Sequence, residues 1–138
     1  MVILDTNVLS AAMASEAVVI TWLNRQSPLS VWTTTVTIFE IRSGLMVMPA
    51  GRRRAEREHA FDNIIDNELE GRVLPFDRAA AEEAARLTAG RRGIGRTGEA
   101  RDTMIAGIAL AQRATLATRN VRHFDDLSVP VVDPWQHR

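Results

Sequence analysis

Short apolar runs along the chain are separated by longer stretches in which apolar residues recur at helical spacing. The runs are continuous rather than alternating, which is typical of strands covered on both faces of a sheet. The run VWTTTV is also rich in β-branched residues, which favour strands. We expect five strands, at residues 2–4, 31–36, 72–77, 115–118 and 129–133.

Between these runs, apolar residues at intervals of three and four predict amphipathic helices. The expected helices cover residues 8–13, 17–23, 38–46, 52–70, 77–91 and 103–112. Strands that alternate with helices of this length predict an α/β fold, with a parallel sheet of about five strands and helices on both faces. The chain of 138 residues shows no internal repeat or linker, so we expect one domain over residues 1–138.

Two helices carry features that we expect to govern packing. The helix after the second strand has an apolar stripe that we expect to be buried, formed by Ile38, Phe39, Ile41, Leu45 and Met46. Gly44 in the same helix is expected to allow close packing against a neighbouring helix. The arginines of the next helix, within residues 52–57, are expected to form a solvated face paired with Glu56 and Glu58.

Composition removes several classes of site. The chain has no Cys, which excludes disulfides, thiolate zinc sites and cysteine nucleophiles, and no Lys, which excludes a P-loop. His59, His123 and His137 fit no metal-binding pattern, and we expect them at the surface. No apolar run approaches 18 residues and no signal peptide is apparent, so we expect a cytoplasmic protein without membrane contact.

Four polar residues fall where strands end or helices begin. Asp5 follows the first strand directly, and Asn120 follows the strand at 115–118. Glu40 lies one turn into the helix after the second strand, and Asp102 opens the helix 103–112. Each has an ordinary structural interpretation: Asp5 and Asp102 as N-caps, Asn120 as a turn or cap residue, and Glu40 as part of a T-x-x-E capping box with Thr37.

The alternative is that these groups meet, because ligands of open parallel sheets bind at the carboxyl ends of the strands. Three carboxylates placed together repel one another and raise their own pKa values unless a cation compensates them. A site with only oxygen ligands suits Mg²⁺ or Mn²⁺. Such an ion polarises a phosphoryl oxygen and lowers the pKa of a bound water, so phosphodiester hydrolysis is the leading chemistry.

Four segments resemble the motif blocks of PIN-domain proteins, in particular the VapC and FitB-like toxins of bacterial toxin–antitoxin pairs. These segments are VILDTNVLS, TTVTIFEIRSG, EARDTMIAGIALAQ and LATRNVRHF, and the ending VVDPW is similar to the FitB-like group. The blocks span the chain in the order and at the spacing of the family. The resemblance implies a PIN-like α/β/α sandwich.

The resemblance also implies roles for individual residues. It makes three acids the ligands of Mg²⁺ or Mn²⁺: Asp5, Glu40 and Asp102. Asn120 occupies a fourth site position that is Asp in many relatives, which leaves the binding of a second metal open. Thr6 and Thr118 match polar positions that line the site, where they would bond a ligand carboxylate or hold a water.

An endoribonuclease is the implied activity, restrained by an antitoxin that carries a DNA-binding domain, and the toxin is expected to form a homodimer. Arginines around the Gly-rich segment 90–100, namely Arg91, Arg92, Arg96 and Arg101, immediately precede Asp102. We expect this segment to be a mobile loop, with Arg92, Arg96 and Arg101 binding RNA phosphates.

Two other functions fit parts of the sequence. A PIN-like binding module with little or no nuclease activity, which tunes the DNA affinity of an antitoxin, is compatible with Asn120 and with the net charge of zero. A metal-dependent phosphatase for small substrates would need a closed pocket, whereas an open groove lined by Arg favours a polymer.

Overall fold

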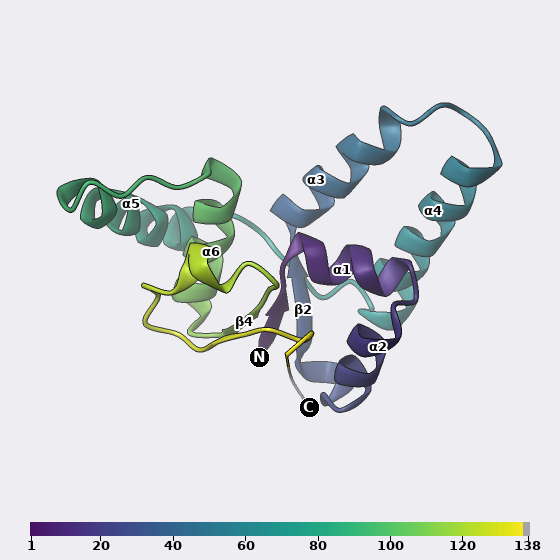
Figure 1. Cartoon of the computed structure of the whole chain (residues 1–138), viewed down its shortest axis with the longest axis horizontal. Helices are drawn as coiled ribbons and strands as arrows, with labels where there is room; N and C mark the ends of the chain where they lie inside the picture. Colours follow the sequence, from purple (N-terminus) through teal and green to yellow (C-terminus); the bar gives the residue numbers. More distant parts are fainter. Residues whose placement is uncertain (137–138) are drawn as a thin grey trace.

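Five short strands pair in parallel to form the central sheet of the computed structural model, which describes residues 1–136 (Figure 1). The strands are β1 (Val2–Leu4), β2 (Val31–Thr34), β3 (Val73–Leu74), β4 (Thr115–Ala117) and β5 (Val131–Val132). Their order in the sheet is β3-β2-β1-β4-β5. All five expected strands are therefore present, each within the range that the sequence predicts. His137 lies outside the described residues.

Within residues 1–136, six α-helices and three short helical segments connect the strands. The α-helices are α1 (Thr6–Met13), α2 (Ala17–Asn24), α3 (Thr35–Met46), α4 (Arg52–Asn63), α5 (Arg78–Gly93) and α6 (Ala100–Gln112). The short segments are the 3₁₀-helices η1 (Pro28–Ser30) and η3 (Val121–Phe124) and the π-helix η2 (Ile64–Glu68). The long helix expected at 52–70 is thus an α-helix that continues as a π-helical turn.

Helices cover both faces of the sheet, as expected for an α/β/α sandwich (Figure 1). Neighbouring residues of the central strand point to opposite sides, so Leu4 packs with α1, α2 and α4 while Ile3 packs with α5 and α6. Strand β4 divides in the same way, with Ala117 on the first side and Leu116 on the second. The sheet is therefore buried on both faces, which explains the continuous apolar runs.

The order of the strands creates a crevice at one edge of the sheet. β1 pairs with β2 on one side, where Val2 faces Val31, and with β4 on the other, where Leu4 faces Ala117. The chain leaves β1 toward β2 and later returns to pair β4 on the opposite side. Open α/β sheets bind ligands outside the carboxyl ends of strands at such a reversal of strand order. In this chain the reversal lies between the ends of β1 and β4.

Strand β2 ends two residues earlier than the sequence predicts. The Thr34 hydroxyl accepts a hydrogen bond from the Thr37 amide at 3.1 Å, which makes Thr34 the N-cap of α3. Thr35 and Val36 have high strand propensity, but this cap places them in the first turn of the helix instead.

The predicted buried stripe of α3 is wrong at two positions. Ile41 and Leu45 are in the core, but Phe39 is 61% exposed and Met46 is 66% exposed. Phe39 and Met46 are seven residues apart, so they share a helix face, and that face points away from the sheet. Their exposure leaves apolar surface on α3.

Close helix packing occurs at Gly107 and not at Gly44 as the sequence suggested. A Cβ atom added at Gly44 would meet nothing within 4 Å, whereas one at Gly107 would lie 2.4 Å from the Ala80 carbonyl oxygen and 2.9 Å from the Ala84 Cβ. Gly107 on α6 therefore lets α5 and α6 approach each other.

Taken one at a time, the helices of residues 1–136 are too short or too polar to cross a membrane, although α1 and α2 pass that test of length and composition as a pair bent by 106°.

We expect Gly107→Ala to destabilise the protein by about 1–3 kcal/mol, because the new methyl group would overpack the contact between α5 and α6. Gly44→Ala is the matched control, and it should stabilise the protein by up to about 1 kcal/mol because Ala is the better helix former. Urea unfolding of both variants measures the difference. Equal stabilities would show that α5 and α6 do not pack as closely as described.

Candidate functional site

Asp5 lies at the carboxyl end of β1 and is 3% exposed. One oxygen of its carboxylate accepts a hydrogen bond from the Thr6 amide at 2.8 Å, so Asp5 does cap α1. The other oxygen accepts a hydrogen bond from the Thr118 hydroxyl at 2.7 Å, and Asn7 Nδ2 lies 3.4 Å from it. Because Thr118 follows β4, this carboxylate bridges the two strands that border the crevice.

Burial raises the pKa of Asp5 above its usual value, and the nearby charges of Asp102 and Glu40 raise it further. The hydrogen bonds from Thr118 and Thr6 act in the opposite direction, but they do not offset the burial. The three acids that the sequence selected therefore act on one another electrostatically, although they lie on three different elements. An ionised Asp5 is costly in this position unless a cation binds beside it.

Glu40 is oriented by α1 and does not form the capping box considered for the sequence. The Thr6 hydroxyl donates a hydrogen bond to Glu40 Oε1 at 2.8 Å, and the same hydroxyl lies 3.1 Å from that of Thr37. Since Thr34 caps α3, the proposed pairing of Glu40 with the Thr37 amide is wrong. The other Glu40 oxygen faces Arg101 Nη1 at 3.7 Å.

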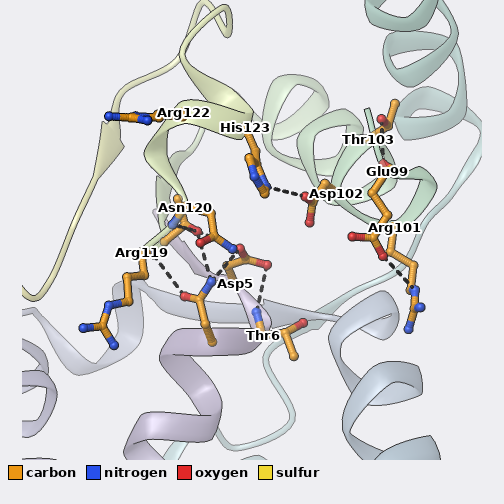
Figure 2. A network of polar contacts seen from close by, with 12 residues as sticks. Asp5, Thr6, Glu99, Arg101, Asp102, Thr103, Arg119, Asn120, Arg122 and His123 are labelled. Atoms are coloured by element: carbon orange, nitrogen blue, oxygen red, sulfur yellow. Dashed lines mark hydrogen bonds and ion pairs between the residues drawn. The ribbon is translucent and has the colours of Figure 1, made fainter. Parts of the chain in front are cut away.

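Asp102 lies inside the first turn of α6 and is not its N-cap, because the helix begins at Ala100 with Glu99 in the cap position. Its carboxylate oxygen Oδ2 is 2.9 Å from His123 Nδ1. Figure 2 shows His123 pointing from η3 toward Asp102, across an opening from Asp5. His123 is thus at the surface, as expected, with its side chain 55% exposed, but the sequence did not indicate its contact with Asp102.

Asn120 occupies the N-cap position of η3 but makes no side-chain cap bond. Its backbone amide donates a hydrogen bond to the Thr118 hydroxyl at 3.0 Å, and its side chain is exposed beside Asp5 (Figure 2). The side chains of Asn120 and His123 both lie beside the opening (Figure 2).

The side chains around this opening have the donor chemistry of a Mg²⁺ or Mn²⁺ site, namely carboxylate and amide oxygens. Within residues 1–136, no group of three acidic or histidine side chains is close enough, in the observed conformation, to coordinate one ion. Two of the acids instead contact basic side chains of the chain, Asp102 that of His123 and Glu40 that of Arg101. Asp5 has no such partner among these residues, and a bound divalent ion would supply the missing charge.

The arginines expected to bind substrate are held in three different ways. Arg92 is exposed near the end of α5. Arg96 pairs with Asp125 at 2.9 Å and donates a hydrogen bond to the Arg122 carbonyl at 3.0 Å. Arg101 lies between Glu40 and Glu99, whose Oε1 is 3.4 Å from its Nε. The Gly-rich loop is shorter than expected, because Gly90–Gly93 belong to α5.

Arg91, from the same arginine-rich segment, is buried and 4% exposed. Its Nε and Nη2 each donate a hydrogen bond of 2.8 Å to the Asp126 carboxylate, and Nη2 also donates one of 2.8 Å to the His123 carbonyl. The Arg91 guanidinium lowers the pKa of Asp126. Arg91 therefore fixes the segment that carries His123 to the end of α5, a structural role that sequence spacing alone did not reveal.

A model of the PIN domain matches residues 2–129 of the chain. The chain belongs to the PIN-domain family. It is 34% identical to the plasmid stability protein StbB of Pseudomonas syringae pv. tomato and 33% identical to VapC ribonuclease Y4jK of Sinorhizobium fredii, in both cases over 138 residues and 99% of each chain. Toxin FitB of Neisseria gonorrhoeae is 29% identical over 98% of this chain and 99% of its own.

The structure of FitAB bound to a DNA fragment contains a similar PIN-domain fold. It superposes with a TM-score of 0.86 at 27% identity and covers 100% of this chain and 98% of the other. The family and the α/β/α fold expected from the four sequence blocks are thus confirmed.

We expect Asp126→Asn to destabilise this PIN domain by about 3 kcal/mol near neutral pH, because the buried Arg91 charge loses its carboxylate partner. The pKa of Asp126 is lowered on folding, so its stabilising effect is complete above the usual value of 3.8 and is lost as the pH falls through the lower folded value. The difference between wild type and variant should therefore shrink in acid. Urea unfolding at several pH values measures it.

Asp125→Asn is the control, because the pair of Asp125 with Arg96 is exposed and should contribute no more than about 1 kcal/mol. If both variants lose the same stability, Arg91 is not held by Asp126 as described.

Proposed function

We propose that this PIN-domain protein is a metal-dependent endoribonuclease that acts as the toxin of a toxin–antitoxin pair. The observation that carries the proposal is the buried Asp5 carboxylate, with its raised pKa, facing Asp102 and Glu40 at the reversal of strand order. Such a site is electrostatically incomplete without a cation. The relationship to VapC ribonuclease Y4jK supports the reaction, and the relationship to Toxin FitB supports the role.

In this proposal Asp5, Glu40 and Asp102 hold Mg²⁺ or Mn²⁺, and Asn120 contributes the fourth site position. When bound, the ion supplies positive charge for a phosphoryl oxygen and lowers the pKa of water. The two threonines orient the carboxylates: Thr118 donates to Asp5 and Thr6 donates to Glu40. Hydrogen bonds of this kind fix ligand geometry and commonly alter metal affinity.

The surface around the acids suits a polymeric substrate. One cleft of about 380 Å³ has Asp102 and His123 in its wall, together with Arg91, Arg96 and Arg122. A second hollow of about 530 Å³ lies between α1, α3 and α4 and has Glu40, Arg57 and Arg101 in its wall. Two hollows that flank the acids fit a strand passing across them better than a small phosphate ester enclosed in one pocket.

An antitoxin with a DNA-binding domain is the proposed partner. The structure of FitAB bound to a DNA fragment supports such an assembly, because its PIN domain matches the whole length of this chain. The exposed side chains of Phe39, Met46 and Val47 leave apolar surface on and just after α3 for another chain. A homodimer, which the family resemblance implies, stays a prediction.

Binding of Mn²⁺ should stabilise the wild-type protein by about 2.7 kcal/mol at a hundredfold excess over the dissociation constant. Asp5→Asn should abolish this gain, because it removes the charge of the central ligand. Thr118→Val should weaken metal binding by about 10- to 100-fold, because Asp5 loses the hydroxyl that orients it. Thermal unfolding with Mn²⁺ or with EDTA measures the effect.

Thr115→Val is the matched control, since Thr115 lies on β4, which leads into Thr118, and its side chain makes no hydrogen bond within residues 1–136. A Mn²⁺ response that survives in Asp5→Asn would contradict the assignment of the ligands.

The reaction is tested by incubating the purified, antitoxin-free protein with a mixed pool of tRNA and rRNA. We expect cleavage that requires Mg²⁺ or Mn²⁺ and is lost in EDTA, in Asp5→Ala and in Asp102→Ala, while Asp66→Ala on the exposed π-helix stays active. Cleavage that persists in the acid variants would contradict the proposal. Metal binding without any cleavage would favour the binding module that tunes an antitoxin.

A further inference from the structure

The cleft beside Asp102 is built around a buried arginine. It lies between the C-terminal end of α5, the 94–99 loop and η3, and a smaller hollow of about 260 Å³ adjoins it. The residues that line both hollows are Arg91, Arg96, Thr97 and Gly98. The cleft therefore begins at the candidate metal site and continues onto the arginine-bearing segment.

One edge of the Arg91 guanidinium is available to a ligand. Its Nε and Nη2 are engaged by Asp126 and by the His123 carbonyl, whereas Nη1 has no hydrogen-bond partner within residues 1–136. The Arg91 side chain is 4% exposed and forms an ion pair with Asp126, and both features hold it in one conformation. A guanidinium fixed in this way presents its remaining N–H groups in one direction without further loss of side-chain entropy.

Gly98 keeps the approach to Nη1 open. A Cβ atom at Gly98 would lie 2.9 Å from Arg91 Nη1 and 3.5 Å from the Thr103 hydroxyl. Gly98 is not among the glycines with positive φ, which are Gly51, Gly71 and Gly95. Its backbone thus accepts any residue, and the feature specific to glycine here is the space in front of the guanidinium.

The donors in the cleft suit an anion with several oxygens. Arg91 and Thr97 line it, together with the acids Glu99 and Asp102. Arg122 of the cleft and Arg92 of the adjoining hollow take part in no ion pair within residues 1–136. Figure 2 shows Arg122 directed away from Asp102, so its charge lies at the outer side of η3. Arginine is well suited to phosphate because its planar N–H groups match the phosphate oxygens.

We propose that this cleft binds a phosphate of the RNA strand next to the one that is hydrolysed, with Arg91 Nη1 as the central donor and Gly98 as the opening. The proposal rests on RNA being the substrate, as proposed above. Asp102 forms part of the cleft wall, so a strand that crosses the acids places a neighbouring phosphate there. Arg91 thus takes the phosphate contact that the sequence assigned to Arg96, whose guanidinium is engaged by Asp125.

Gly98→Ala tests the cleft without removing a charge. We expect it to weaken the binding of a short fluorescein-labelled oligoribonucleotide roughly tenfold, the loss that corresponds to one charge-assisted hydrogen bond. Fluorescence anisotropy in EDTA measures binding without cleavage. Gly93→Ala is the matched control, because a Cβ atom there would meet nothing within 4 Å, and it should bind as the wild type does.

Titration with inorganic phosphate, followed through the NMR signal of the Arg91 Nε–H group, distinguishes the source of the phosphate. The proposal predicts that phosphate shifts this signal in the wild type and in Gly93→Ala but not in Gly98→Ala. Equal RNA affinities for wild type and Gly98→Ala would overturn it. A phosphate response without any RNA binding would also overturn it, in favour of a site for free phosphate or a mononucleotide.

The same experiment separates this proposal from the proposed nuclease. If RNA binds in EDTA and depends on Gly98 while no metal-dependent cleavage is found, the cleft stands and the nuclease function fails. If the wild type cleaves RNA and Gly98→Ala binds and cleaves RNA as well as the wild type does, the nuclease function stands and the proposed phosphate site fails.

Discussion

The structure depends on keeping one carboxylate, that of Asp5, out of water at the carboxyl ends of the paired strands β1 and β4. Burial makes its charge costly, and the charges of Asp102 and Glu40 increase that cost. The Thr6 amide and the Thr118 hydroxyl satisfy both carboxylate oxygens, but neither group carries a positive charge. The buried carboxylate therefore lowers the stability of the fold at this position. Such a loss of stability is common at functional sites, for example where an acid must bind a cation.

Each acid of the site is oriented by a residue from a different element, so the site also joins the two halves of the fold. Thr118 links β4 to Asp5, Thr6 links α1 to Glu40 on α3, and His123 links η3 to Asp102 on α6. Arg91 completes the arrangement by fixing η3 to the end of α5. Because these contacts come from both helical layers, the shape of the opening is set by the packing of the whole domain.

The fold and the position of Asp5 at the edge of the sheet were accessible from the sequence, because an acid placed directly after a buried run marks the carboxyl edge of a parallel sheet. The packing details were not. Both Gly44 and Gly107 are visible as glycines, but only the arrangement of α5 against α6 shows which one a neighbour approaches. The contact between Asp102 and His123 depends in the same way on how α6 and η3 are placed relative to each other. No pattern of apolar and polar residues in the sequence indicates that placement. The N-cap at Thr34 likewise overrode the strand propensity of the residues that follow it.

Anomalous diffraction from a crystal soaked in Mn²⁺ would show whether a divalent cation completes this group of acids. We expect an anomalous peak in the opening shown in Figure 2, with the ion coordinated by Asp5 and Asp102 and with His123 displaced from Asp102. A crystal soaked in the same way that shows no peak there, or shows Mn²⁺ only at acids elsewhere on the surface, would contradict it.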